Sequence, residues 1–511
     1  MRRTWSRGFL TKKYDCYGPA MGALRAAVVG AGFGGVGAAI ELREMGVEVT
    51  VLERAASLGG VWRENDYPGA ACDVPSYLYS YSFAPKRDWT RKFSHQPEIL
   101  EYLAEVAERF GILEHIRFDT TVLGATFDEA RGIWVLELAG GETVTADILV
   151  TACGQMSAPA YPPVPGRDDF AGPAFHSARW RHDVDLAGKR VAVVGTGASA
   201  IQFVPAIAAE PESLTVFQRS PGYVIAKDDA VYDAPLSRWR LRAERYRTFL
   251  LKELFSIRFN HYPALFATVE RKFRHYLRDQ LPDDELRAKV DPVDRFGCKR
   301  ILISNDWYAA LRRPNVRVVD HAVARITSGG VVTADGTEHP ADVIVYGTGF
   351  RATEFLASLR IVGRDGQELS QAWREGAEAY LGITVTGFPN LFLVYGPNTN
   401  VGHNSIVFMI EAQLAYITDA VRRLQRQAPA VMDLRPEVHS SFSTTMQKRS
   451  RRTVYAQGCT NWFITENGKH TQNWPGSAIA YWLRTRRVRW ADYRVTAVPR
   501  DRAQMTASPT S

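Results

Sequence analysis

The sequence predicts an α/β protein that contains two copies of one unit, formed by a strand, a glycine-rich turn, a helix and a second strand. Three observations predict this fold. The turn at residues 30–35 (GAGFGG) follows the apolar pair Val28-Val29, and the turn at 195–199 (GTGAS) follows the apolar run 191–194. Each turn precedes an Ala-rich stretch of helical character. Between residues 228 and 292, long Arg- and aromatic-rich stretches with helical spacing indicate a helical insertion in the second copy.

The position after the second strand distinguishes the two units. Glu53 stands 23 residues after Gly30, and Gln218 stands 23 residues after Gly195, so the two occupy equivalent places. A carboxylate here accepts hydrogen bonds from ribose hydroxyls and repels a 2′-phosphate, whereas a neutral residue followed by arginine accommodates that phosphate. Glu53 therefore favours FAD or NAD, and Gln218 with Arg219 favours NADPH. We expect two Rossmann-like dinucleotide-binding domains, one for FAD and one for NADPH.

The two units supply most of the residues expected to bind the cofactors. The glycines allow a tight turn and a close approach of the backbone to a pyrophosphate, which the start of the following helix stabilises. The expected residues are Gly30, Gly32, Gly35 and Glu53 in the first unit and Gly195, Thr196, Gly197, Ala198, Ser199 and Arg219 in the second.

Breaker residues and repeated strand ends suggest the domain boundaries. The first part of the FAD-binding domain spans residues 22–158 and ends before a proline-rich connection. The NADPH-binding domain spans 159–340, with the helical insertion at about 228–292. Residues 341–498 return to the FAD-binding domain, because the segment after the second unit would otherwise have no partner sheet. Residues 1–21 and 499–511 are expected to be loose termini, and Met21 is an alternative start of translation.

Composition excludes several classes of protein. The 511 residues are 46% hydrophobic and 23% charged, as in a globular protein of two or three domains. The five cysteines are scattered and lack CxxC spacing, so we expect no disulfide framework, no redox dithiol and no metal site. No apolar run approaches the roughly 18 residues that a membrane span needs.

The formal net charge of +8 has two interpretations. Arg-rich clusters at 448–452 and 484–489 could contact nucleic acid or a membrane surface, but neither accompanies a recognised nucleic-acid module, so we interpret them as solvated faces. Residues 1–20 lack the apolar core of an export signal. We expect a cytoplasmic enzyme with no nucleic-acid partner and no stable membrane insertion. The sequence does not determine the oligomeric state.

Three further strings resemble the signatures of one enzyme family. Residues 170–180 (FAGPAFHSARW) fit the pattern FxGxxxHxxxW, residues 59–73 (GGVWRENDYPGAACD) form a second string, and residues 297–300 (GCKR) form a third. Together they resemble type I Baeyer-Villiger monooxygenases. The segments 391–400, 461–463 and 473–476 also look like segments that close the flavin domain in that family.

One position departs from the family pattern. Arg181 follows Trp180 where the family usually has Pro or Asp, which leaves the subgroup open. Trp180 itself favours the ketone-oxidising branch, because the related flavin-containing monooxygenases that oxidise nitrogen and sulfur usually have Tyr there.

The resemblance implies an FAD- and NADPH-dependent monooxygenase that uses dioxygen to convert a ketone to an ester or lactone through a flavin C4a-peroxide. The charged species on this path are anions, which arginine stabilises well because it does not lose its proton. By match to the family motifs, Arg300 is the catalytic cation, Asp73 is the carboxylate that positions it, and Lys299 joins Arg219 on the 2′-phosphate. The other residues expected at the cofactors are Gly60, Trp62, Tyr67, Asp73 and Trp462.

Alternatives stay open at several of these positions. Asp73 could form a purely structural ion pair, Arg300 could lie at the surface, and the aromatic residues could pack in the core. His176 is expected to act at a hinge between domains rather than as a general base, because no proton transfer in the reaction needs one there. Oxygenation of nitrogen or sulfur and a flavin-bound redox sensor are the other functions considered. Small cyclic ketones, steroids and polyketides all fit as substrates.

Overall fold

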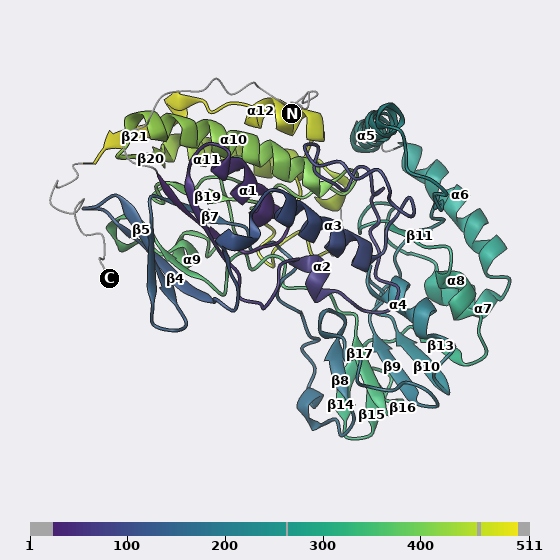
Figure 1. The fold of residues 1–511 in the computed structure, drawn as a ribbon. Coiled ribbons are helices and arrows are strands. Elements are labelled where there is room, and N and C mark those ends of the chain that lie inside the picture. Colours follow the sequence, from purple (N-terminus) through teal and green to yellow (C-terminus); the bar gives the residue numbers. More distant parts are fainter. Residues whose placement is uncertain (1–23, 262–263, 457–460, 499–511) are drawn as a thin grey trace.

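Two parallel sheets in two lobes organise the molecule (Figure 1). The computed structural model describes residues 24–261, 264–456 and 461–498. The first lobe, at the left of Figure 1, contains the N-terminal unit and most of the C-terminal third of the chain. The second lobe lies at the lower right, and helices α5 (Arg238–His261), α6 (Ala264–Gln280) and α7 (Asp284–Val290) follow the right edge. The termini predicted to be loose, including Met21, fall outside the described residues.

The first sheet holds five parallel strands in the order β19 (Leu391–Leu393), β7 (Ile148–Thr151), β1 (Arg25–Val29), β2 (Glu48–Leu52) and β3 (Ile116–Arg117). Helices α1 (Phe33–Arg43), α3 (Gln96–Arg109) and α10 (Ile406–Gln427) share one core with it. Its central strands are rich in Val, Ile, Leu and Ala, as expected for a parallel sheet covered on both faces. Small residues let α1 approach α10, since a Cβ added at Gly37 would lie 2.9 Å from Cδ1 of Leu414.

The strand β19 shows that the chain returns to the first lobe. It pairs with β7, more than 200 residues earlier in the sequence. A mixed sheet in the order β18 (Arg360–Val362), β4 (Val122–Asp128), β5 (Ile133–Leu138) and β6 (Thr143–Ala146) joins the same two regions, because β18 pairs with β4. The first lobe is therefore made from two separate parts of the chain.

The second sheet repeats the design of the first. Its five parallel strands run in the order β13 (Val316–Val319), β10 (Ser213–Phe217), β9 (Arg190–Val194), β17 (Val343–Tyr346) and β8 (Ala174–His176). Residues from 341 onward were expected in the first lobe, but β17 pairs with β9 in the second. In the first unit the last strand, β7, lies beside the first strand, β1, and in the second unit β17 lies beside β9 in the same way. The chain therefore returns to the first lobe only after β17.

The helical segment connects the two lobes. Leu241 of α5 belongs to the core of the first lobe, whereas Phe266, Phe273 and Leu277 of α6 belong to the core of the second. Asp283 begins α7 by accepting hydrogen bonds from the amides of Glu285 and Leu286. The segment predicted to be a helical insertion thus contains three helices and touches both cores.

The remaining elements are short or lie at the edges of the lobes. They are α2 (Val61–Glu64), α4 (Ala200–Ile207), β11 (Val224–Ile225), β12 (Leu302–Ile303), α8 (Trp307–Leu311), β14 (Val323–Thr327), β15 (Gly330–Thr333), β16 (Glu338–Pro340), α9 (Leu369–Ala372), β20 (Ala430–Leu434), α11 (Pro436–Ser450), α12 (Ala478–Thr485) and β21 (Tyr493–Ala497).

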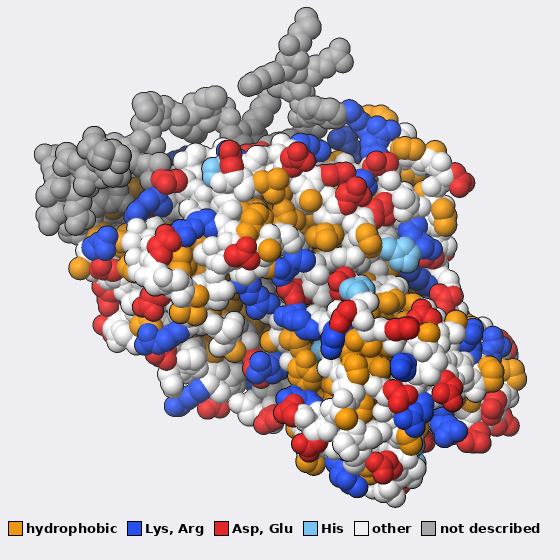
Figure 2. All heavy atoms as spheres, turned by 60° about the horizontal axis from the view of Figure 1, so that its bottom comes forward, with side chains coloured by type: hydrophobic (Ala, Val, Ile, Leu, Met, Phe, Trp, Pro, Cys, Tyr) orange, Lys and Arg blue, Asp and Glu red, His pale blue; other side chains and the backbone are white. Residues whose placement is uncertain are grey.

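On the face drawn in Figure 2, Lys and Arg side chains are interspersed with Asp and Glu side chains, so charges of both signs are mixed on this face. Within the described part of the chain, no helix is long and apolar enough to cross a membrane. The same residues contain no group of His, Cys, Asp and Glu side chains that could hold a metal ion.

Candidate active site

The two glycine-rich turns have the same geometry. Gly30 has a φ of 103° and Gly195 a φ of 104°, a region that favours glycine. A Cβ added at Gly30 would lie 2.8 Å from the carbonyl oxygen of Ala152, and one at Gly195 would lie 2.5 Å from that of Gly347. Gly35 lets α1 close against the turn, because its Cβ would lie 1.7 Å from the oxygen of Gly30. Both turns, here called the glycine cradles, therefore require glycine because the backbone passes close to the neighbouring strand, as in the tight turns of units that bind a pyrophosphate.

The residue after the second strand differs between the units in charge, as predicted, and also in the direction of its side chain. Glu53 is buried and lines the cavity described below, and its Oε2 accepts a hydrogen bond of 2.7 Å from the amide of Ala31. Gln218 turns the other way, and its Nε2 donates a hydrogen bond of 2.7 Å to the oxygen of Lys289 in α7. Arg219, not Gln218, faces the cavity in the second unit.

One cavity of about 1200 Å³ connects the two cradles. Every residue predicted to bind a cofactor or to act in catalysis lines it except Gly35, which lies behind the first turn. These lining residues are Gly30, Gly32, Glu53, Gly60, Trp62, Tyr67, Asp73, Gly195, Thr196, Gly197, Ala198, Ser199, Arg219, Lys299, Arg300 and Trp462. The cavity is long enough to touch both units and is shared between the lobes.

Lys299 is tied to the neighbour of Arg219 by a hydrogen bond to Ser220, a residue that the sequence analysis did not single out. Its Nζ donates a hydrogen bond of 2.7 Å to Oγ of Ser220, the neighbour of Arg219, and pairs with Asp294 at 2.7 Å. Two cations and a hydroxyl therefore gather after β10, where a 2′-phosphate would lie in a dinucleotide-binding unit. Lys299 follows Cys298, which is disulfide-bonded, a feature that the scattered cysteines did not predict.

Arg300 and Asp73 form an ion pair where the two lobes meet. Nε of Arg300 donates to Oδ2 of Asp73 at 3.1 Å and Nη2 donates to the same oxygen at 2.5 Å, although 227 residues separate them. Burial raises the pKa of Asp73, but the charge and hydrogen bond of Arg300, with smaller contributions from Lys252 and the backbone, together hold that pKa below its ordinary value. The carboxylate in turn raises the pKa of Arg300 above its ordinary value. Both groups are therefore charged at neutral pH.

The segment that carries Asp73 is held from both lobes. Gln202 of α4 accepts a hydrogen bond of 2.9 Å from the hydroxyl of Tyr67 and donates one of 3.0 Å to the oxygen of Ala71. On the other side, the amide of Cys72 donates to the oxygen of Ser94 at 3.0 Å. Sequence reasoning missed Gln202, because a glutamine in an apolar helix carries no local sign of its partner.

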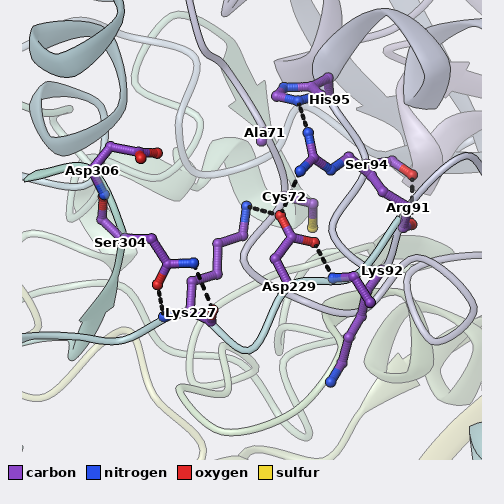
Figure 3. Close-up of polar contacts among 12 residues, drawn as sticks. Ala71, Cys72, Arg91, Lys92, Ser94, His95, Lys227, Asp229, Ser304 and Asp306 are labelled. Carbon is purple, nitrogen blue, oxygen red and sulfur yellow. Dashed lines mark hydrogen bonds and ion pairs between the residues drawn. The ribbon is translucent and has the colours of Figure 1, made fainter. Parts of the chain in front are cut away.

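A charged cluster next to Cys72 supports the same segment (Figure 3). Arg91 and Lys227 point toward Asp229, with nitrogen-to-oxygen distances of 3.0 and 3.3 Å, and Arg91 also contacts His95 at 2.6 Å. Asn305 holds the backbone of Lys227 through two hydrogen bonds. The cluster thus joins residues 91–95 to the start of the helical segment, immediately behind the site.

The inward face of α5 also reaches the site. Thr248 contacts the hydroxyl of Tyr77 at 3.2 Å, and one turn later the ammonium of Lys252 lies close enough to Asp73 to lower the pKa of that carboxyl further. The carboxylate of Glu253 accepts hydrogen bonds from Nδ2 of Asn404 at 2.8 Å and pairs with His403 at 3.0 Å. Asn404 lines the cavity, so α5 supports the cavity wall. Neither Lys252 nor Glu253 was predicted, since charged residues abound in this segment.

The aromatic residues predicted at the cofactors have distinct surroundings. Nε1 of Trp62 donates to the hydroxyl of Tyr79 at 3.0 Å, which fixes the indole at the cavity edge. Burial raises the pKa of Tyr67 to about 12, so its phenol keeps its proton. Trp462 is 36% exposed and lines the cavity, and the centre of its ring lies 4.5 Å from the ring centre of Phe463. Its partial exposure argues against the alternative of simple core packing.

Comparison with known proteins identifies the family. The model of the flavin-binding monooxygenase-like family matches residues 23–361. The chain belongs to this family. It is 45% identical over 481 residues to a Baeyer-Villiger monooxygenase of Streptomyces coelicolor, covering 92% of each chain. The resemblance that the sequence motifs indicated is thereby confirmed.

Two solved structures share the fold. The chain is similar to the cyclohexanone monooxygenase from Rhodococcus sp. Phi1 bound to NADP+, with a TM-score of 0.81 and 31% identity over 91% of this chain and 96% of that one. It is also similar to OTEMO in complex with FAD and NADP, with a TM-score of 0.84 and 26% identity over 93% of this chain and 99% of that one. The predicted α/β fold with two dinucleotide-binding units is therefore confirmed.

Two residues of the fingerprint at 170–181 lie apart from the cavity of this flavin-binding monooxygenase-like protein. His176 is fully buried, its Nδ1 accepts from the amide of Ala178 at 3.1 Å, and burial lowers its pKa to about 4. Its ring contacts Tyr161 and Phe350, which lie on the two connections between the lobes. Arg181 pairs with Asp183 at the surface. The unusual Arg181 therefore has no direct contact with the cavity, and His176 is neutral at pH 7.

Proposed function

We propose that this protein is an FAD- and NADPH-dependent Baeyer-Villiger monooxygenase. Its reaction converts a ketone, dioxygen, NADPH and a proton to an ester or lactone, water and NADP+. The observation that carries the proposal is the Arg300–Asp73 ion pair, which lines the single cavity shared by both glycine cradles. FAD, when bound, activates dioxygen with the two electrons that NADPH supplies. Because NADPH is an intracellular metabolite, we also propose a cytoplasmic location.

The chain's own residues divide the binding of the cofactors between the units. We assign Gly30 and Gly32 to the FAD pyrophosphate and Glu53 to its ribose, with Gly35 closing α1 behind them. Residues 195–199 would hold the pyrophosphate of NADPH. Arg219 and Lys299 would bind its 2′-phosphate, with Ser220 keeping Lys299 in place. Gly60, Trp62 and Tyr67 would shape the part of the cavity that holds the flavin, and Trp462 would contact the nicotinamide.

Arg300 supplies a fixed positive charge at the reacting centre. Negative charge develops on the ketone oxygen as its carbon becomes tetrahedral, and a guanidinium cannot lose its proton to that oxygen. Asp73 keeps the planar guanidinium in one orientation through its two contacts to a single oxygen. Lys252 adds a second, half-buried cation near Asp73 and so helps to keep the carboxylate ionised. Asp73 therefore positions Arg300, and Arg300 acts on the substrate.

An isotope experiment tests the reaction. The holoenzyme is given NADPH, 18O-labelled dioxygen and a panel of cyclic, steroidal and open-chain ketones, and products are analysed by mass spectrometry. One labelled oxygen atom in an ester or lactone is expected. Arg300→Ala should lower ester formation by about 100-fold or more while retaining FAD, because a preorganised charge of this kind contributes that much. Arg181→Ala, at a surface arginine that directly follows the string 170–180, is the matched control and should change little.

The same panel separates the alternative reaction. If the enzyme oxygenated nitrogen or sulfur instead, amines or sulfides would outcompete every ketone and Arg300→Ala would retain turnover. That pair of results would overturn the proposal. The panel also identifies the substrate class, which we leave open among small cyclic ketones, steroids and polyketides.

A further inference from the structure

Helix α5 turns charged side chains toward the protein, beside the apolar residues Leu241 and Phe249 that pack in the core of the first lobe. Nη1 of Arg245 donates to the backbone oxygens of Tyr77 at 2.8 Å and Ser80 at 3.0 Å. Glu253 is 2% exposed and is hydrogen-bonded to Asn404. Lys252 is half-buried, and its ammonium lies close enough to Asp73 to lower the pKa of that carboxyl. Lys252 and Glu253 follow Arg245 by seven and eight positions, which is about two helical turns. All three side chains therefore lie on the same side of α5.

The opposite face of α5 presents large apolar side chains to solvent. The exposed fractions are 79% for Trp239, 51% for Leu250, 55% for Leu251 and 57% for Leu254. Trp239, Leu250 and Leu254 are 11 and 4 residues apart, so they form one stripe along the helix. Isolated exposed leucines are common, but a stripe of this kind on one helix marks a surface that is covered in use.

Basic residues border this stripe. Arg240, Arg242 and Arg247 are exposed on the same helix, and the guanidinium of Arg242 lies 5.6 Å from the ring centre of Trp239. Glu244 is the one acidic residue of α5 on the outward side and pairs with Arg247 at 3.2 Å. The outward face of α5 therefore combines apolar and positive character.

The neighbouring helix α12 also carries exposed apolar and basic side chains. The amide of Ile479 in α12 donates to Glu253 at 3.3 Å, so the start of α12 touches α5. Both helices lie along the upper edge of the molecule in Figure 1. Leu483 of α12 is 50% exposed. It adjoins an exposed basic group, namely Arg484, Arg486, Arg487 and Arg489, which the proposed reaction does not use.

We propose that the outward face of α5, together with Leu483 and the arginines at the C-terminal end of α12, docks on the surface of an anionic phospholipid membrane. Trp239 and the leucines would enter the boundary between headgroups and acyl chains, and the arginines would contact lipid phosphates. A second copy of the chain fits less well, because a symmetric contact would bring two basic rims together in a protein whose net charge is +8. The helix lies on the membrane and does not span it. This inference does not depend on the proposed reaction.

Vesicle flotation with the FAD-loaded full chain tests the proposal. Vesicles of phosphatidylcholine alone are compared with vesicles in which phosphatidylglycerol replaces about one third of that lipid. Binding is expected to the anionic vesicles and to weaken at high salt. Leu250→Ser with Leu254→Ser should reduce the partition coefficient by about tenfold or more, since apolar side chains drive such insertion. Leu123→Ser is the matched control, because Leu123 of β4 is also 51% exposed but lies away from α5.

Two further measurements keep the test decisive. Bound FAD and the melting temperature show whether the double variant folds, and Arg240→Gln with Arg242→Gln offers a second variant that leaves the apolar residues intact. It should weaken binding to anionic vesicles only. Failure of the unaltered protein to bind anionic vesicles would overturn the proposal. So would sedimentation showing a dimer that the double leucine variant dissociates, because the occupant would then be a second copy.

Discussion

The two dinucleotide units share a backbone but use the residue after the second strand differently. In the first, Val28 pairs with Val51, and in the second, Val193 pairs with Val216, so the registers are equivalent. The amides of Gly30 and Gly195 donate to the ends of the second strands at 2.9 Å in both. Glu53 faces the cavity, whereas Gln218 binds the backbone of α7 and leaves Arg219 at the cavity.

The rule that a neutral residue after the second strand favours NADPH therefore predicts the cofactor, although it accounts for only part of the role of Gln218. The neutral residue at position 218 is consistent with NADPH because it adds no negative charge. Its side chain, however, has a structural task, since it anchors the helical segment to β10. We propose that Arg219, Lys299 and Ser220 select the 2′-phosphate instead.

The largest effect is expected from adding a side chain at the first glycine of each cradle. Gly30→Ala and Gly195→Ala each place a Cβ within 2.8 Å of a backbone oxygen, at a φ that alanine rarely adopts. Strain alone costs roughly 1–3 kcal/mol at such positions, and the contact adds to it. Gly30→Ala should lose FAD during purification. Gly195→Ala should keep FAD but lose reduction by NADPH, as measured by flavin absorbance. Loss of FAD from both variants would contradict the division of the cofactors.

A smaller effect is expected at the phosphate group. Arg219→Ala with Lys299→Ala should raise the KM for NADPH by about 30-fold or more, because two charge-assisted contacts are removed. The KM for NADH should change less than about threefold. Steady-state rates with each nucleotide measure both values, and Arg317→Ala, at an exposed arginine of β13, serves as a control. Equal increases for both nucleotides would contradict the assignment.

Gln218→Glu separates the two explanations of the neutral position. The carboxylate would face the oxygen of Lys289 without a proton to donate, and a buried acceptor left in this way costs roughly 1–3 kcal/mol. We expect a lower melting temperature with a nearly unchanged ratio of NADPH to NADH efficiency. A variant that is stable but prefers NADH would show that position 218 selects the cofactor directly.

The smallest effect concerns pH and the second lobe. Burial lowers the pKa of His176 to about 4, whereas an unfolded histidine titrates near 6.5. The neutral ring is favoured in the folded state, so its contribution is complete above pH ~6.5 and declines as the pH falls toward about 4. His176→Asn keeps an acceptor for the amide of Ala178 and should flatten that decline. Urea unfolding between these pH values measures it, and an unchanged slope would contradict the prediction.

The sequence by itself determined the local architecture of the site. Glycines before helices, apolar runs of strand length and a spacing of 23 residues from Gly30 and from Gly195 are properties of short segments, and they predicted both units and their order. The helical segment was visible for the same reason. The family motifs added Arg300, Asp73 and Trp462, whose roles no local pattern reveals.

Only the tertiary structure decided which distant residues meet. It placed Arg300 beside Asp73, held the Asp73 segment with Gln202 and brought Lys252 of α5 behind it. The tertiary structure also showed that β17 pairs with β9 in the second sheet. Strands that are neighbours in a parallel sheet need not follow one another in the chain, so the sequence did not determine this pairing. The packing of distant charges and the orientation of a helix depend on all the surrounding elements, so the exposed apolar face of α5 could not be predicted from the sequence.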